Sequence, residues 1–230
     1  MLADGLSYPV EGENAVGRLL IGGVLGLASV LVLPVFLLLG YLVRVLAASA
    51  RGVEEPPAFE AWGELFVSGL KATVVVLAYG LVPFVLLAVS ATVLAGGVAA
   101  GDGAVTGLVG GLGALGVLVS LLATALLYYL VPAALTSMAV QGSFGDAFDA
   151  GTLKSLLLSV DYLVAWVVPF VVAVAVNVVV AVLAVTVVGL LVVPFVQFYA
   201  QVAVFYMFGA AYGEVVGVAG AGPESTAVAV

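Results

Sequence analysis

The stretch that decides the fold is residues 162–213, which read YLVAWVVPFVVAVAVNVVVAVLAVTVVGLLVVPFVQFYAQVAVFYMFGAAYG. This run contains no Asp, Glu, Lys or Arg, and further charge-free runs cover residues 19–43, 72–101 and 103–145. A helix needs about 20 consecutive apolar residues to cross the hydrocarbon core of a bilayer. Because every run is long enough, the sequence predicts an all-α fold, a polytopic bundle of transmembrane helices.

The composition of the whole chain agrees with this fold class. Hydrophobic residues make up 65% of the 230 positions and charged residues 8%, whereas soluble domains carry about 25% charged residues. Acids outnumber bases by 13 to 5, for a net charge of −8, which disfavours nucleic acid as a partner because nucleic acid needs a basic patch. The acidity is typical of a high-salt cytoplasm, in which ions screen the repulsion between surface acids. Chance among so few charges is the alternative interpretation.

Several chemistries are excluded by the residues that the chain lacks. It contains no cysteine and no histidine, which removes disulfides, thiol catalysis and histidine acid–base work. The acids lie in loops, and no serine lies in a nucleophile-elbow sequence. We therefore expect no catalytic residue, no cofactor and no metal site, and we expect that the protein is not an enzyme. The acidic start, with Asp4, Glu11 and Glu13, does not resemble a signal peptide.

Five membrane crossings are predicted within a single domain, residues 1–212. The expected helices are 19–46, 72–95, 114–140, 162–184 and 189–212. Pro34 should kink the first helix. A re-entrant hairpin at Pro34 is the alternative, but its two arms are each too short to span, whereas a tilted helix of about 42 Å spans comfortably. The tail, 213–230, is small and polar and is predicted to be disordered.

The orientation in the cell membrane follows from the basic residues. With five crossings, the face that carries the C-terminus holds four of them, Arg44, Arg51, Lys71 and Lys154, and the other face holds Arg18. Short loops rich in Lys and Arg stay cytoplasmic. We therefore expect an external N-terminus and a cytoplasmic C-terminus. Asp161, at the start of the fourth crossing, is predicted to be an interfacial cap.

The chain carries an apparent internal repeat of two crossings each. Residues 41–43, Tyr-Leu-Val, recur at 129–131, and residues 83–85, Pro-Phe-Val, recur at 169–171. Between them, Ala-Phe-acid-Ala recurs at 58–61 and 147–150. Such units would be parallel repeats, related by an axis along the membrane normal.

The first polar linker of this repeat has the pattern of a short amphipathic helix. Phe59, Trp62 and Phe66 recur at helical spacing, while Glu60 and Glu64 occupy another face. Such helices lie in the bilayer interface with the aromatic side towards the acyl chains. The linker predicts either a platform that binds partners or lipids, or a plain interfacial anchor.

The second polar linker repeats this design. Phe144 and Phe148 lie one turn apart, with Asp146 and Asp149 beside them. Ser143 and Asp146 have the spacing of a capping box at a helix start. The same two interpretations apply, so the predicted platform comprises five aromatic residues from the two linkers.

Three uncharged polar residues fall inside the predicted spans. Asn177 lies near the middle of the fourth crossing, and Gln197 and Gln201 lie one turn apart on the fifth. Side-chain amides in lipid require hydrogen-bond partners, and polar groups on neighbouring helices can provide them. The three residues therefore predict either structural hydrogen bonds between helices or a polar substrate or water path.

Glycines spaced four apart predict close helix packing. The pairs Gly22–Gly26 and Gly209–Gly213 have the GxxxG spacing that lets two backbones approach. We expect this packing to occur within the bundle rather than in a specific dimer. The glycines of 101–113 lack the Lys-Ser/Thr pair of a phosphate-binding loop.

The combined motifs resemble a known family. They are the stretches Tyr8-Pro9, Gly40-Tyr41-Leu42-Val43-Arg44, Glu54-Glu55-Pro56-Pro57, Trp62-Gly63-Glu64-Leu65-Phe66, Pro132-Ala133-Ala134 and Tyr162-Leu163-Val164-Ala165-Trp166. Together they are similar to the archaeal membrane family called domain of unknown function 4013, which is common in salt-loving archaea. The resemblance implies a multi-helix membrane protein and supplies no activity, so no functional residue is carried over.

Two functional hypotheses remain. The first is a non-catalytic membrane protein that organises partner proteins or lipids through its two cytoplasmic linkers. The alternative is a small transporter or channel subunit with a polar site between the fourth and fifth crossings. In both cases the bilayer is the principal environment.

Overall fold

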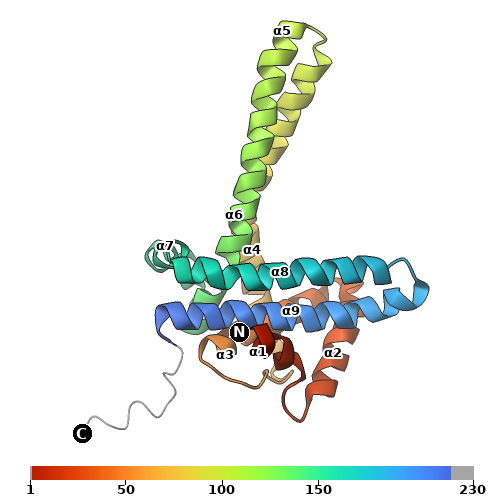
Figure 1. Ribbon diagram of the computed structural model, residues 1–230, viewed down its shortest axis with the longest axis vertical. Coiled ribbons are helices and arrows are strands. Elements are labelled where there is room, and N and C mark those ends of the chain that lie inside the picture. Colours follow the sequence, from red (N-terminus) through yellow and green to blue (C-terminus); the bar gives the residue numbers. More distant parts are fainter. Residues whose placement is uncertain (1, 219–230) are drawn as a thin grey trace. The chain divides into compact units, whose positions relative to one another are not determined.

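The structure is a computed structural model that describes residues 2–218, apart from the side chains of residues 155, 161, 164 and 165 (Figure 1). Every regular element in this part of the chain is a helix, which confirms the all-α prediction. Five helices are long and apolar enough to cross a membrane. The predicted cap Asp161 and the end of the tail, 219–230, lie outside the described residues.

The helices follow one another with short connections. Their bounds are α1 Leu2–Ser7, η1 Tyr8–Val10, α2 Ala15–Leu27, η2 Ala28–Leu31, α3 Leu33–Ala50, α4 Trp62–Ala99, α5 Gly103–Val105, η3 Thr106–Gly110, α6 Gly111–Gln141, η4 Phe144–Phe148, α7 Ala150–Leu157, α8 Val160–Leu183 and α9 Val187–Val216. The chain forms two compact units: unit 1, residues 1–73 and 132–230, and unit 2, residues 74–131.

The prediction of one continuous helix over 19–46 is wrong. In its place, α2 and α3 are separated by the η2 turn and by Val32, whose φ of 66° lies in the left-handed region. Valine rarely adopts this conformation, which ends a helix abruptly. Pro34 lies in the first turn of α3, where its missing N–H costs nothing, so the proline begins a helix instead of kinking one.

The two arms on either side of this break pass α9 in opposite senses. On α2, Gly26 lies against Pro194 and Gly22 lies against Phe198, so the residue numbers of the contacts run in opposite directions. On α3, Tyr41 contacts Phe198, and further along the chain Ala50 contacts Gly213. The chain therefore turns back on itself between α2 and α3.

The segment before α2 lies beside the first linker. The Tyr8 hydroxyl donates to the Glu55 carbonyl oxygen at 3.4 Å, and the Tyr8 ring lies 4.1 Å from the Tyr206 ring on α9. Gly5 packs against Met207. The chain's first turns are thus held near the C-terminal half of α9.

The other predicted spans agree better with the structure. The expected helices 72–95 and 114–140 lie within α4 and α6, and the break expected near residues 186–189 falls between α8 and α9. Figure 1 shows α8 and α9 side by side, joined by this short turn. Thr186 caps α9 by accepting a hydrogen bond from the Gly189 N–H at 2.9 Å. The tail prediction is wrong for residues 213–216, which continue α9.

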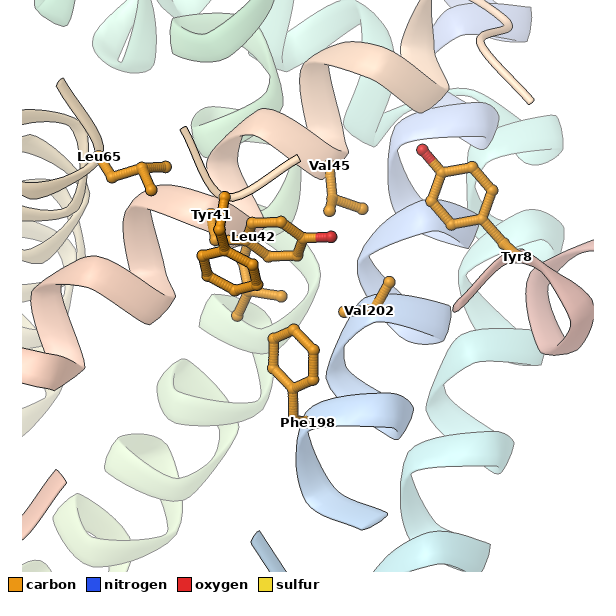
Figure 2. Packing of buried hydrophobic residues seen from close by; sticks show 8 residues of the cluster. Tyr8, Tyr41, Leu42, Val45, Leu65, Phe198 and Val202 are labelled. Atoms are coloured by element: carbon orange, nitrogen blue, oxygen red, sulfur yellow. The ribbon is translucent and has the colours of Figure 1, made fainter. Parts of the chain in front are cut away.

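The core of unit 1 is built from aromatic and aliphatic side chains of η1, α3, α4, α9 and the connection between α3 and α4 (Figure 2). Tyr41 of α3 is 1% exposed and stacks on the Phe59 ring at 4.1 Å with an interplanar angle of 9°. Phe198 of α9 lies 5.5 Å from Tyr41 and 5.9 Å from Phe59. The remaining members are Tyr8, Leu42, Val45, Leu65 and Val202.

Unit 2 is a helical hairpin formed by the middle of the chain. Gly97 of α4 lies directly against the backbone of Gly110, and the Thr106 hydroxyl donates to the Gly97 carbonyl oxygen at 3.0 Å. Asp102 begins the return arm by accepting from two backbone N–H groups. Asp102 is the single charged residue of unit 2.

The internal repeat stays a prediction. Its two units correspond in element order to α3–α4 and α6–α8. The matched aromatic residues have different surroundings, because Phe59 is 8% exposed and Phe148 is 41% exposed.

The helices α3 and α4 approach each other closely in unit 1. A Cβ at Gly69 would overlap the carbonyl oxygen of Phe36, and a Cβ at Gly40 would overlap that of Leu65. Both obstacles are backbone atoms, which cannot move aside as a side chain can. Glycine at these two positions therefore sets the separation of the two helices.

We expect Gly69→Ala to lower the thermal unfolding midpoint of the purified protein by several degrees. Overpacking typically costs about 1–3 kcal/mol, and here a methyl group would push α4 away from α3. Gly63→Ala is the matched control, since Gly63 is on the same helix and has open space around it. The unfolding midpoints of both variants are measured by scanning fluorimetry in detergent. Equal midpoints for Gly69→Ala and Gly63→Ala would contradict this packing.

Candidate functional site

The structure brings the three intramembrane amides together at one cleft. Asn177 comes from α8, and Gln197 and Gln201 come from successive turns of α9. They line a cavity of about 80 Å³. The other lining residues are Ala173, Val176, Ala200, Val204 and Phe205.

The amides do not bond to one another across the interface. The Asn177 side chain donates to the Ala173 carbonyl oxygen at 2.7 Å, within its own helix. Neither Gln197 nor Gln201 makes a side-chain hydrogen bond to any residue among those described, 2–218. The arrangement therefore lacks the direct helix-to-helix bonds that a purely structural role would use. It leaves donors and acceptors at the cavity wall.

The cleft is uncharged as well as polar. All eight of its lining residues are neutral, and both helices belong to the charge-free run 162–213. Small side chains at Ala173 and Ala200 make the space, and Phe205 closes part of it. Chemically, such a site can exchange hydrogen bonds but cannot balance a full charge.

The structure divides the predicted aromatic platform of the first linker. Phe59 is 8% exposed and stacked on Tyr41, so it belongs to the core of unit 1 and is unavailable to lipid or partner. Trp62 begins α4 and is 45% exposed. Phe66 is half-buried and meets the Phe36 ring edge-on at 5.5 Å. Pattern alone placed Phe59 on a helix, but that helix begins only at Trp62.

The second linker presents its two aromatic residues as predicted. Phe144 and Phe148 are 38% and 41% exposed, with ring centroids 5.5 Å apart. The Ser143–Asp146 capping box is confirmed at the start of η4. Asp149 caps α7, and hydrogen bonds from the Thr152 hydroxyl and from backbone N–H groups lower its pKa. The cap is therefore kept at neutral pH and weakens only as the carboxylate is protonated in acid.

Arg18 forms a buried polar cluster that the sequence did not reveal. The residue is 5% exposed, donates to the Glu11 carbonyl oxygen, and lies 3.7 Å from the Glu55 carboxylate. Its Nε has no acceptor in the described structure. In the predicted five-crossing topology, Arg18 was the one basic residue on the outer face. Its separation from the other four basic residues was the sequence feature that could have pointed to this cluster.

The remaining basic residues near the linkers are also held by specific contacts. Arg44 donates to the Glu60 carbonyl oxygen at 2.7 Å and pairs with the Glu64 carboxylate at 3.3 Å. Arg51 donates to the Val140 carbonyl oxygen at 3.0 Å, which ties the start of the first linker to the start of the second. The two linkers therefore meet at the same end of unit 1.

No group of three or more Asp or Glu side chains in the part of the chain described here is arranged to hold a metal ion. The Glu55 carboxylate lies 3.7 Å from Arg18, and the Glu64 carboxylate lies 3.3 Å from Arg44.

Comparison with known proteins identifies a family but assigns no activity. A family model described as "Protein of unknown function (DUF4013)" matches residues 24–185. No curated protein and no solved structure matches the chain.

Proposed function

Because the chain belongs to the DUF4013 family, whose description names no activity, we propose from its geometry that it is a non-catalytic membrane protein that organises partner proteins or lipids. The proposed docking surface is the linker face, defined as the end of unit 1 that carries residues 51–62 and 140–149. One observation carries this proposal: three exposed aromatic side chains, Trp62, Phe144 and Phe148, project from a pair of linkers that Arg51 joins.

The charges around these aromatic residues support a binding role. Glu60 is exposed and Asp146 is half-buried beside them, and aromatic side chains with a polar rim are typical of binding surfaces. A plain interfacial anchor needs the aromatic residues alone. The contacts made by Arg44 and Arg51 hold both linkers in place without using the aromatic rings.

We also propose that the linker face is cytoplasmic and that both termini lie on it. All five basic residues belong to unit 1, and four of them lie at this end: Arg18 on Glu55, Arg44 on Glu60, Arg51 on Val140 and Lys154 in α7. Lys71 lies further along α4, near the level of Phe36. The positive-inside rule then favours a cytoplasmic linker face. The contact between Tyr8 and Glu55 supports the same side for the N-terminus, which revises the external N-terminus expected from five crossings.

The acidic exterior supports a location in a cell membrane that faces a high-salt cytoplasm. Salt-loving archaea, in which the family that the sequence resembles is common, have such a cytoplasm. Glu54, Glu60 and Glu64 crowd one linker, and their repulsion is screened over only about 3 Å at 1 M salt.

Cysteine labelling tests the topology directly, because the native chain contains no cysteine. We expect Glu13→Cys and Glu214→Cys to react with an impermeant maleimide from the same side of sealed vesicles. Val185→Cys, in the exposed turn between α8 and α9, should react from the other side. Labelling of Glu13→Cys and Glu214→Cys from opposite sides would restore a single span over 19–46.

Site-specific photo-crosslinking tests the docking surface. A photoreactive residue at Phe148 or Trp62 should give protein adducts or adducts with one lipid class in native membranes. The same residue at Val179, which is exposed on α8, is the matched control and should give bulk-lipid adducts. Phe144→Ala should reduce the Phe148 adducts without lowering the unfolding midpoint, whereas Phe59→Ala should lower the midpoint because it removes a core ring. Identical adducts at Phe148 and Val179 would contradict the docking surface and would show that the linkers act only as interfacial anchors.

The cleft between α8 and α9 favours a second candidate function, a small transporter or channel subunit. The observation that favours this function is the uncharged cleft of about 80 Å³, which three amide side chains line. Proteoliposomes should then pass water or a small neutral solute faster than protein-free vesicles, as measured by stopped-flow light scattering. A rate equal to that of protein-free vesicles would exclude this function.

A further inference from the structure

We propose that the cleft between α8 and α9 is a binding site for a small neutral hydrogen-bonding molecule, of the size class of water and urea, and that it rejects ions. The proposal rests on the second candidate function for its biological meaning, since it names the substrate class of that same site. It is independent of the linker face, because the two share no residue.

The size of the cleft favours a small ligand. A site needs about 10–15 Å³ to hold one water, and a water occupies about 30 Å³ in the liquid. The cavity of about 80 Å³ therefore accommodates a few waters or one solute of a few heavy atoms. Sugars, amino acids and nucleotides would extend beyond the space that the cleft encloses.

The hydrogen-bonding groups of the cleft require a ligand that both donates and accepts. Each amide carries one carbonyl oxygen and two N–H donors. Asn177 uses one donor on the Ala173 carbonyl oxygen, and the side chains of Gln197 and Gln201 use none on any described residue. Asn177 is exposed on α8, and Gln197 and Gln201 are half-buried on α9, so in a bilayer these groups would face acyl chains. Unmade hydrogen bonds are costly there, and a bound neutral molecule would supply them.

The absence of charge among the lining residues argues against an ion. Hard cations in proteins take six or more oxygen ligands, usually with carboxylates among them. Asn177, Gln197 and Gln201 offer three side-chain oxygens, and their neighbours in the cavity wall are apolar. An anion would likewise meet no cationic group in this wall.

The composition of the chain makes a decisive experiment simple. The sequence contains two asparagines, Asn14 and Asn177, and three glutamines, Gln141, Gln197 and Gln201. Selective ¹⁵N labelling of side-chain amides therefore gives five signals, of which Asn14 and Gln141 are exposed and serve as internal controls. The full-length protein is studied in nanodiscs with deuterated acyl chains, and the signals are assigned by single substitutions.

We expect magnetisation transfer from water to the side-chain amides of Asn177, Gln197 and Gln201, as at the two controls. Added urea should shift the three cleft signals saturably, whereas ammonium chloride at the same concentration should leave them unchanged. Transfer at the controls alone would overturn the proposal, since the cleft would then be filled by lipid or by a second copy of the chain. Equal shifts with ammonium would also overturn it.

Filling the cleft tests whether the signals arise from this cavity. Ala173→Leu should abolish the water transfer and the urea shift at Gln197 and Gln201, and Ala173→Val is the smaller change if the leucine variant does not fold. Ala175→Leu is the matched control, because Ala175 is exposed on the same helix and does not line the cleft. Persistence of both effects in a folded Ala173 variant would refute the site. Binding without permeation in proteoliposomes would retain the site and exclude only the transport function.

Discussion

The arrangement of unit 1 depends on how closely α3 approaches its two neighbours. Lipid chains are as apolar as leucine, so helices in a bilayer associate through van der Waals packing and not through hydrophobic burial. Gly40 and Gly69 let the backbones of α3 and α4 touch, and Gly209 and Gly213 do the same between α3 and α9. The GxxxG pair on α9 is thus used inside the bundle, as its spacing indicated.

This close approach explains why the linker is part of the core. With α3 and α9 in contact, the Tyr41 ring lies between Phe198 and the chain segment that follows α3. Phe59 fills the remaining space as a stacked ring. Phe59 thus ties the linker to the core, and Trp62 is exposed at the start of α4. Phe59 is therefore buried and Trp62 exposed, although both belong to the same amphipathic pattern in the sequence.

The pairing of α8 with α9 contains a polar cleft as well as apolar contacts. Its amides come from positions that sequence periodicity brings to one interface, yet each leaves hydrogen-bonding capacity unused. The linker face and this cleft share no residue, and they carry different chemistry. The first is aromatic and acidic, while the second is neutral and small.

The sequence by itself determined the spans after the first, the break between α8 and α9, the Ser143 cap and the grouping of Asn177, Gln197 and Gln201. These features follow from local causes: the cost of placing charges in lipid, the capping of free backbone groups and the helical period. Only the tertiary structure decided the turn at Val32, the burial of Phe59 and the place of Arg18 beside Glu55. Those features depend on which surfaces meet α9 and the first linker. A contact between residues far apart in the chain leaves no periodic signal in the sequence.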